Sequence, residues 1–200
     1  MKNSRFVLVF DTSVVCELCH AGILEKLINY RNVLGENTEF ILPEKVFEEL
    51  QKGRRIAKCS LLGKIFRVVQ VPDAIAKDIG FRKPKLGPGE LSVLAVAVSL
   101  MKEDPSSSVV AVIDEKIGRR AAEELGLKVH GFLWILIQFK KHGIVDTKKA
   151  LEIVEKLQER GFRVAEEILM QTIETIKKIV IFQLCNPSHN NFMFKLVRVL

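Results

Sequence analysis

Four acidic residues stand at points where the sequence is expected to change from one structural element to the next. Asp11 and Asp114 each directly follow an apolar, β-rich run of the kind that forms a buried strand. Glu90 begins a long apolar segment after a Gly-Pro-Gly turn, and Glu49 lies one position before the apolar Leu50 on a predicted short helix. Ligands of open α/β sheets bind outside the carboxyl ends of the strands. We therefore expect these carboxylates to face one crevice.

Carboxylates that converge in one cleft repel one another and need cations to stay ionised together. Oxygen ligands without Cys or His suit Mg²⁺ or Mn²⁺, and such ions can activate water and neutralise the charge of a displacement at a phosphodiester. Each acid also has a purely structural interpretation. Asp11 and Asp114 can cap helices, Glu90 can complement a helix dipole, and Glu49 can be a solvated neighbour of Glu48. The four acids in this order are harder to explain by capping alone.

The composition adds an excess of basic residues to this acidic set. Among 200 residues, Lys and Arg number 31 against 24 Asp and Glu, which gives a net charge of +7 and favours polyanionic partners such as nucleic acid. Aromatic residues make up only 7% of the chain, which argues against a platform that stacks single-stranded bases. No apolar stretch reaches the roughly 18–20 residues of a membrane span, and no signal peptide is visible. We expect a soluble, cytoplasmic protein without a membrane partner.

Predicted strands alternate with predicted helices, which is typical of βαβ units and a parallel sheet. The expected strands cover residues 5–10, 40–42, 66–71, 109–113 and 128–130. The expected helices cover residues 14–30, 44–52, 54–63, 73–80, 90–101, 116–125 and 133–142. Pro43 is expected to open the second of these helices, and a turn-rich basic loop spans residues 81–89.

The same patterns predict three parts of the chain. The first is an α/β domain over residues 1–145. The second, residues 146–180, contains two amphipathic helices that form a hairpin packed on or beside the first part. The third is an irregular tail over residues 181–200, which shows no clear hydrophobic period.

The ordered set of segments resembles the PIN-domain family. The segments are FDTSVV (10–15), LPEKVFEEL (42–50), GPGELSVLAVAVSL (87–100) and VIDEKIGRRAAEELGLKVHGFLWILI (112–137). They are most similar to a PIN-like branch of archaeal and bacterial chromosomes, whose members often end in a helical hairpin. The resemblance covers about residues 5–180 and implies a three-layer α/β/α fold with a central parallel sheet. It also implies a Mg²⁺- or Mn²⁺-dependent ribonuclease; many such proteins are VapC-type toxins paired with a small antitoxin.

The family's functional positions carry over onto specific residues of this chain. By this resemblance, four acids are the catalytic and metal-binding residues: Asp11, Glu49, Glu90 and Asp114. Ser13 is the hydroxyl neighbour of the first acid, and Glu115 is the rival of the last one, because the end of the strand is ambiguous by one residue. Ser92 stands where related sequences often have a further acid, so the number of bound metal ions, one or two, stays open.

Basic residues near these acids are the predicted RNA contacts, although each group is also typical of a solvated charged surface. They are Arg54, Arg55, Lys83, Lys85, Arg119 and Arg120. The missing acid at Ser92 supports an alternative, a PIN-like nucleic-acid-binding or regulatory module with weak or no catalysis. Besides RNA, the resemblance implies a homodimer and a small antitoxin as partners.

The string CELCH at residues 16–20 matches the pattern of a c-type haem attachment site. It lies within a predicted core helix, and no second cysteine pair exists that would complete a zinc site. We therefore expect thiols that pack in the core and no haem, redox or zinc function.

Overall fold

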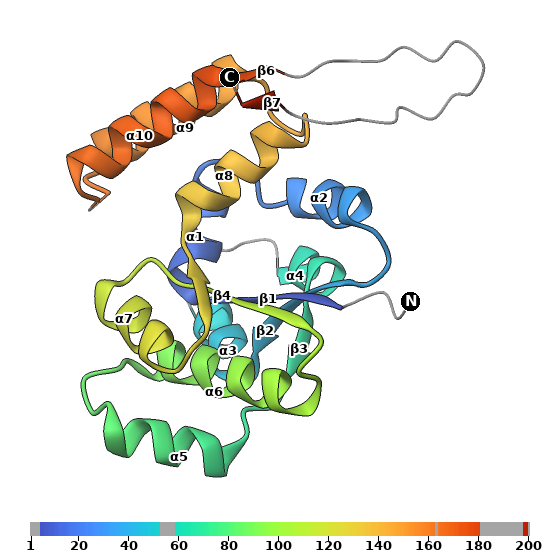
Figure 1. The fold of residues 1–200 in the computed structure, drawn as a ribbon, viewed down its shortest axis with the longest axis vertical. Helices are drawn as coiled ribbons and strands as arrows, with labels where there is room; N and C mark the ends of the chain where they lie inside the picture. The colour runs from blue at the N-terminus through green and yellow to red at the C-terminus, as the bar shows by residue number, and fades with distance from the viewer. Residues whose placement is uncertain (1–4, 53–58, 163, 181–197, 200) are drawn as a thin grey trace. The chain divides into compact units, whose positions relative to one another are not determined.

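A five-stranded parallel sheet is the central element of the computed structural model, which describes residues 5–52, 59–162, 164–180 and 198–199. The strand order is β3-β2-β1-β4-β5 (Figure 1). The strands are β1 (Phe6–Phe10), β2 (Thr38–Pro43), β3 (Arg67–Val69), β4 (Ser108–Val112) and β5 (Lys128–His130). All neighbouring pairs in this sheet run parallel, as the alternating pattern predicts.

Helices cover both faces of this sheet, which confirms the α/β fold with three layers. They are α1 (Thr12–His20), α2 (Lys26–Leu34), α3 (Glu44–Lys52), α4 (Cys59–Ile65), α5 (Asp73–Arg82), α6 (Pro88–Glu103) and α7 (Lys116–Glu124). Helix α6 contacts β1, β2 and β4 on one face, whereas α2 and α4 lie on the opposite face (Figure 1). Because both faces are covered, the inner strands are continuous apolar runs rather than alternating ones.

The chain divides into two compact units, Met1–Phe132 and Leu133–Leu200. Helix α8 (Phe132–Lys141) begins at the division. In the second unit, α9 (Thr147–Glu159) packs against α10 (Glu166–Lys178), so the predicted helical hairpin is present. The short strands β6 (Ile179–Val180) and β7 (Arg198–Val199) pair antiparallel, whereas most of the predicted irregular tail lies outside the described residues. The division into residues 1–145, 146–180 and 181–200 stays a prediction.

Some predicted boundaries are wrong for local reasons. The single helix expected over residues 14–30 is two helices, because Gly22 adopts a left-handed conformation with φ of 67° and ends the first one. Pro43 is the last residue of β2 and does not open α3. Helix α6 begins at Pro88, so it already contains Gly89, whereas the sequence pattern predicts a loop over residues 81–89. Residues 54–58 of the helix expected over 54–63 lie outside the described part of the chain.

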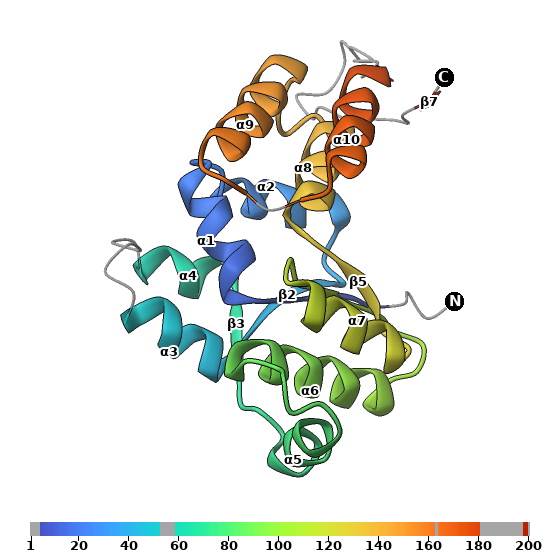
Figure 2. The ribbon, with the colours of Figure 1, turned by 90° about the vertical axis from the view of Figure 1, so that its left-hand side faces the viewer.

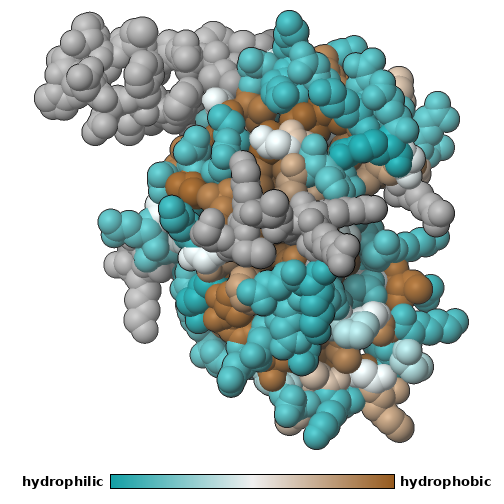
Figure 3. Space-filling model, turned by 180° about the vertical axis from the view of Figure 1, so that it is seen from behind, coloured by the Kyte–Doolittle hydropathy of each residue, from teal (hydrophilic) through white to brown (hydrophobic). Residues whose placement is uncertain are grey.

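Apolar side chains fill the interior, and polar ones dominate the surface that Figure 3 draws, with smaller hydrophobic areas between them. The strands β1 and β4 and the helix α6 supply many of the fully buried residues. Within the described residues, every helix is too short or too polar to cross a membrane.

Candidate active site

The first and last of the four acids lie at the carboxyl ends of the adjacent strands β1 and β4. Phe10 is aligned with Val112 in the sheet, and the backbone N–H of Asp11 donates to the carbonyl of Val112 at 3.0 Å. The strand order reverses at this pair of strands, which is where ligands of open α/β sheets bind. The N-termini of α1, α3, α6 and α7 gather on the same side (Figure 2).

Asp11 is buried, with 5% of its surface exposed, and it is the N-cap of α1. Its Oδ2 accepts hydrogen bonds from the Ser13 hydroxyl at 2.7 Å and from the Ser13 backbone N–H at 3.2 Å. The capping interpretation is therefore correct for one oxygen, and Ser13 lies next to Asp11, while its supporting role stays a prediction. The other oxygen, Oδ1, does not take part in this cap and faces Gly89.

Glu49 lies beside Asp11, and Gly89 leaves the space between them open. The Thr12 hydroxyl donates to Glu49 Oε2 at 2.5 Å. A Cβ atom placed on Gly89 would lie 3.0 Å from Glu49 Oε2 and 3.1 Å from Asp11 Oδ1. Because both oxygens are that close to one point, they are at most about 6 Å apart. The structure therefore brings the first two predicted acids together against a residue without a side chain.

Glu90 connects α6 to α7 through two backbone N–H groups. Its Oε2 accepts from the N–H of Gly87 at 2.8 Å, and its Oε1 accepts from the N–H of Gly118 at 3.1 Å. Burial raises the pKa of Glu90, and the nearby charge of Asp11 raises it further, although the two hydrogen bonds oppose this. Glu90 is thus a helix-capping residue, a role more specific than the predicted complement to the helix dipole, and its pKa also responds to the charge of Asp11.

Asp114 has one satisfied oxygen and one orphaned oxygen. Its Oδ1 accepts from the backbone N–H of Phe132 at 2.9 Å, while its Oδ2 is buried without a hydrogen-bond partner in the described part of the chain. Burial raises the pKa of Asp114 to about 6, against the lowering effects of the Phe132 N–H and the Arg119 charge. The charge of Asp11 also raises this pKa, so the two strand-end acids influence each other.

The remaining predicted site residues fall into different environments. Glu115 is exposed, and its charge contributes to the raised pKa of Glu90. Ser92 is buried and donates to the carbonyl of Pro88 at 2.7 Å, so it has a structural role within α6. Among the predicted RNA contacts, Arg119 lies beside Asp114. Three others line one pocket, Lys83, Lys85 and Arg120. Arg54 and Arg55 lie outside the described residues.

Two residues that shape the site were not predicted from the sequence, Thr12 and Gly131. Thr12 contacts Glu49, which lies 37 positions further along the chain, and no local pattern indicates that pairing. Gly131 leaves room for Asp114, because a Cβ atom there would overlap Asp114 Oδ1. Gly89, which adjoins Glu90, was a signal of such a close approach in the sequence, whereas Gly131 adjoins no predicted site acid. Cys16 and Cys19, expected to pack in the core, are only half-buried.

The donor chemistry of the acidic residues fits a hard divalent cation. Asp11 and Glu49 offer carboxylate oxygens to one space, and the orphaned Oδ2 of Asp114 adds a buried oxygen in need of a partner. Within the described residues, no three His, Cys, Asp or Glu side chains are close enough to hold one ion together. Carboxylate oxygens of Glu90 and Asp114 instead accept hydrogen bonds from backbone N–H groups.

Comparison with known proteins identifies the family of the chain. No curated protein matches the sequence. Among solved structures, the chain is similar to a chain of VapBC-1 from nontypeable Haemophilus influenzae, with 16% sequence identity and a TM-score of 0.47. That likeness covers 63% of this chain and 98% of the other. A family described as PIN domain matches residues 7–178, a stretch that includes all four acids. The chain belongs to the PIN-domain family.

Proposed function

We propose that this PIN domain is a metal-dependent ribonuclease that acts at the carboxyl ends of β1 and β4. The observation that carries the proposal is the convergence of Asp11 Oδ1 and Glu49 Oε2 on the open space beside Gly89. Two carboxylates held this close repel each other, and a cation between them removes that cost. The basic excess of the chain, +7, suits a polyanionic substrate.

The residues of the site have different roles in this proposal. Asp11 and Glu49 hold Mg²⁺ or Mn²⁺, and the hydroxyls of Ser13 and Thr12 fix the two carboxylates in place. Asp114 does not form one metal-ligand group with Asp11 and Glu49 in the described residues, so it would act on the ion through its negative charge once that carboxyl is ionised. When bound by Asp11 and Glu49, such an ion would supply an activated water and would neutralise charge at the phosphodiester.

Glu90 and Arg119 complete the proposed site. Through the N–H groups of Gly87 and Gly118, Glu90 keeps the start of α6 in register with α7. Arg119 lies close to Asp114, and its guanidinium offers a positive charge to a phosphate near the acids. The chain therefore presents a negative centre for a cation with a positive group beside it.

A cleavage assay with two matched variants tests the proposal. Glu49→Gln and Glu48→Gln each remove one negative charge from α3, but Glu49 faces Asp11, whereas Glu48 pairs with Lys45 at the surface. We expect wild type and Glu48→Gln to cleave a labelled RNA pool with millimolar Mn²⁺, and EDTA to stop both. Glu49→Gln is expected to be slower by about tenfold or more, because losing even a residue that supports a metal ligand costs that much. Equal rates for the two variants would refute the assignment.

A PIN-like RNA-binding module with weak or no catalysis is the second candidate. The observations that favour it are Ser92, which stands in place of a further acid, and the lack of three clustered metal ligands in the described residues. RNA binding without Mn²⁺-stimulated cleavage by the wild type, and without calorimetric Mn²⁺ binding, would establish this module in place of the nuclease.

We also propose, from membership of the family, that a small antitoxin and a second copy of the chain are partners. Affinity purification from the native host, followed by mass spectrometry and light scattering, tests both partners. A small co-purifying protein would support the antitoxin, and a particle mass near twice the 22.6 kDa of the chain would support the dimer. Recovery of a lone monomer would contradict both.

A further inference from the structure

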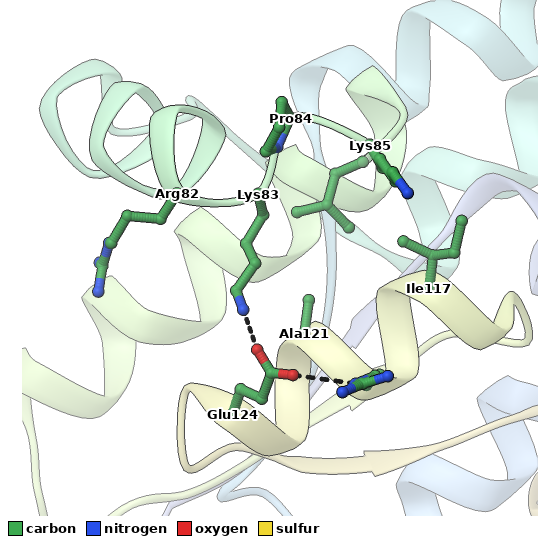
Figure 4. A pocket seen from close by; sticks show the side chains of 9 residues that line it. Arg82, Lys83, Pro84, Lys85, Ile117, Ala121 and Glu124 are labelled. Carbon is green, nitrogen blue, oxygen red and sulfur yellow. Dashed lines mark hydrogen bonds and ion pairs between the residues drawn. The ribbon is translucent and has the colours of Figure 1, made fainter.

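A surface pocket of about 400 Å³ lies between α7 and the loop that joins α5 to α6 (Figure 4). Its volume is within the range of roughly 300–1,000 Å³ that is typical of small-ligand sites. Six of its lining residues carry the argument: Arg82, Lys83, Lys85, Leu86, Ile117 and Arg120. The pocket is therefore large enough for a nucleotide-sized ligand.

Positive charge predominates in this pocket. Glu124 is its acidic lining residue, and both of its oxygens are taken up, one by Lys83 and the other by Arg120 Nε at 3.1 Å (Figure 4). Arg82 pairs with Asp78 on α5. Within the described residues, Lys85 makes no ion pair, and it is exposed. The pocket thus retains a net positive charge and an uncompensated ammonium group.

An apolar surface lies among these cations. Ile117 has 52% of its surface exposed, although large hydrophobic residues usually lie in the core. Leu86 contributes further apolar surface to the same pocket. A nucleotide combines an anionic phosphate with a sugar and a base that favour apolar contact, so it matches both kinds of lining.

Both walls of the pocket are linked directly to Glu90. On one wall, Leu86 precedes Gly87, whose N–H donates to Glu90 Oε2 at 2.8 Å. On the other, Ile117 precedes Gly118, whose N–H donates to Glu90 Oε1 at 3.1 Å. The pocket therefore lies next to the two backbone groups that bind Glu90.

We propose that this pocket binds a nucleotide that flanks the cleaved bond of a single-stranded RNA, with Lys85 on its phosphate and Ile117 against its sugar and base. The inference rests on the proposed ribonuclease function for the identity of the ligand. A continuous strand with one phosphate per nucleotide fits a cationic pocket whose walls adjoin the backbone partners of Glu90. An acidic peptide would not be bound at the acids, so nothing in the proposed function would bring it to the pocket next to Glu90.

Binding of a fluorescein-labelled octauridylate, measured by fluorescence anisotropy in EDTA, tests the pocket separately from catalysis. Lys85→Gln and Lys102→Gln each remove one exposed positive charge, but Lys102 lies in the last turn of α6, far from Glu90 in the first turn. We expect Lys85→Gln to weaken binding about fivefold at 0.1 M salt and to lower the salt slope by about 0.7, as for one lost phosphate contact on a single strand. Lys102→Gln should leave both values unchanged.

A second variant tests the apolar half of the pocket. Ile117→Asn is expected to weaken octauridylate binding and to leave the binding of inorganic polyphosphate, which has no sugar or base, unchanged. Equal effects of Lys85→Gln and Lys102→Gln on RNA would overturn the proposal. So would a labelled oligoglutamate peptide that binds more tightly than RNA and loses affinity in Lys85→Gln.

The two proposals fail in distinguishable ways. A lack of Mn²⁺-stimulated cleavage together with the expected Lys85→Gln effect would refute the nuclease and support the RNA pocket. Cleavage that depends on Glu49, together with equal binding by the two lysine variants, would refute the pocket and support the nuclease.

Discussion

Replacing Asp114 by Asn makes the cost of burying this carboxyl measurable. In the folded chain without metal, burial raises the pKa of Asp114 to about 6, whereas an ordinary Asp titrates near 3.8. The folded state therefore keeps a proton that the unfolded state releases between about pH 4 and pH 6. Because the raised pKa belongs to the folded state, this carboxyl makes the fold less stable as the pH rises through that window.

The size of the effect follows from the two pKa values. The difference corresponds to a destabilisation of the fold by about 3 kcal/mol. This destabilisation is absent below about pH 4 and reaches its full size above about pH 6. Asn carries no charge at any pH, and its carbonyl oxygen can still accept from the Phe132 N–H. The free energy of unfolding of Asp114→Asn relative to wild type should therefore rise by about 3 kcal/mol between pH 4 and pH 7.

Denaturant unfolding in EDTA at several pH values between 4 and 7 provides the assay. Glu115→Gln is the matched control, because it removes one negative charge from the adjacent, exposed position. We expect the pH-dependent difference in Asp114→Asn and not in Glu115→Gln. A difference between Asp114→Asn and wild type that stays constant over this range would refute the reasoning, and so would one that falls as the pH rises.

Substitutions at three further positions test how the two converging acids are held. Gly89→Ala puts a methyl group 3.0 Å from Glu49 Oε2, so calorimetric Mn²⁺ affinity should fall about tenfold or more while circular dichroism is unchanged; wild-type affinity would contradict the open space. Thr12→Val removes the hydrogen bond to Glu49, worth about 1 kcal/mol, so the Mn²⁺ Kd should rise about fivefold and Thr12→Ser should restore it. Asp11→Asn keeps the N-cap of α1 and removes the repulsion with Glu49, so its unfolding free energy in EDTA should exceed that of wild type, whereas Asp11→Ala, which also loses the cap, should lie about 1 kcal/mol below Asp11→Asn.

The sheet was predictable because its strands are buried on both faces. The apolar runs that become β1 and β4 have no polar alternation, and an acid follows each run. The strand-end positions of Asp11 and Asp114 can therefore be predicted from the order of residues alone. The predicted helix over residues 14–30 failed because its hydrophobic period continues across a glycine. Only the left-handed conformation of Gly22 shows where the helix ends.

The finer geometry of the site depends on contacts between distant segments. Glu48 and Glu49 are adjacent acids, and the sequence alone leaves open which one is solvated, whereas the structure turns Glu49 toward Thr12 and Gly89. The backbone partners of Glu90 and Asp114 depend on how α7 and the turn after β5 approach them. Residue types indicated the chemistry of the site, and tertiary packing determines which oxygens remain available.

Anomalous diffraction from crystals grown with Mn²⁺ tests most directly whether Asp11 and Glu49 share a divalent cation. The account predicts a peak beside Gly89, within roughly 2.0–2.6 Å of an oxygen from each carboxylate, and no such peak in Glu49→Gln crystals. Wild-type crystals that show no peak there, or a peak that contacts neither Asp11 nor Glu49, would contradict the central claim.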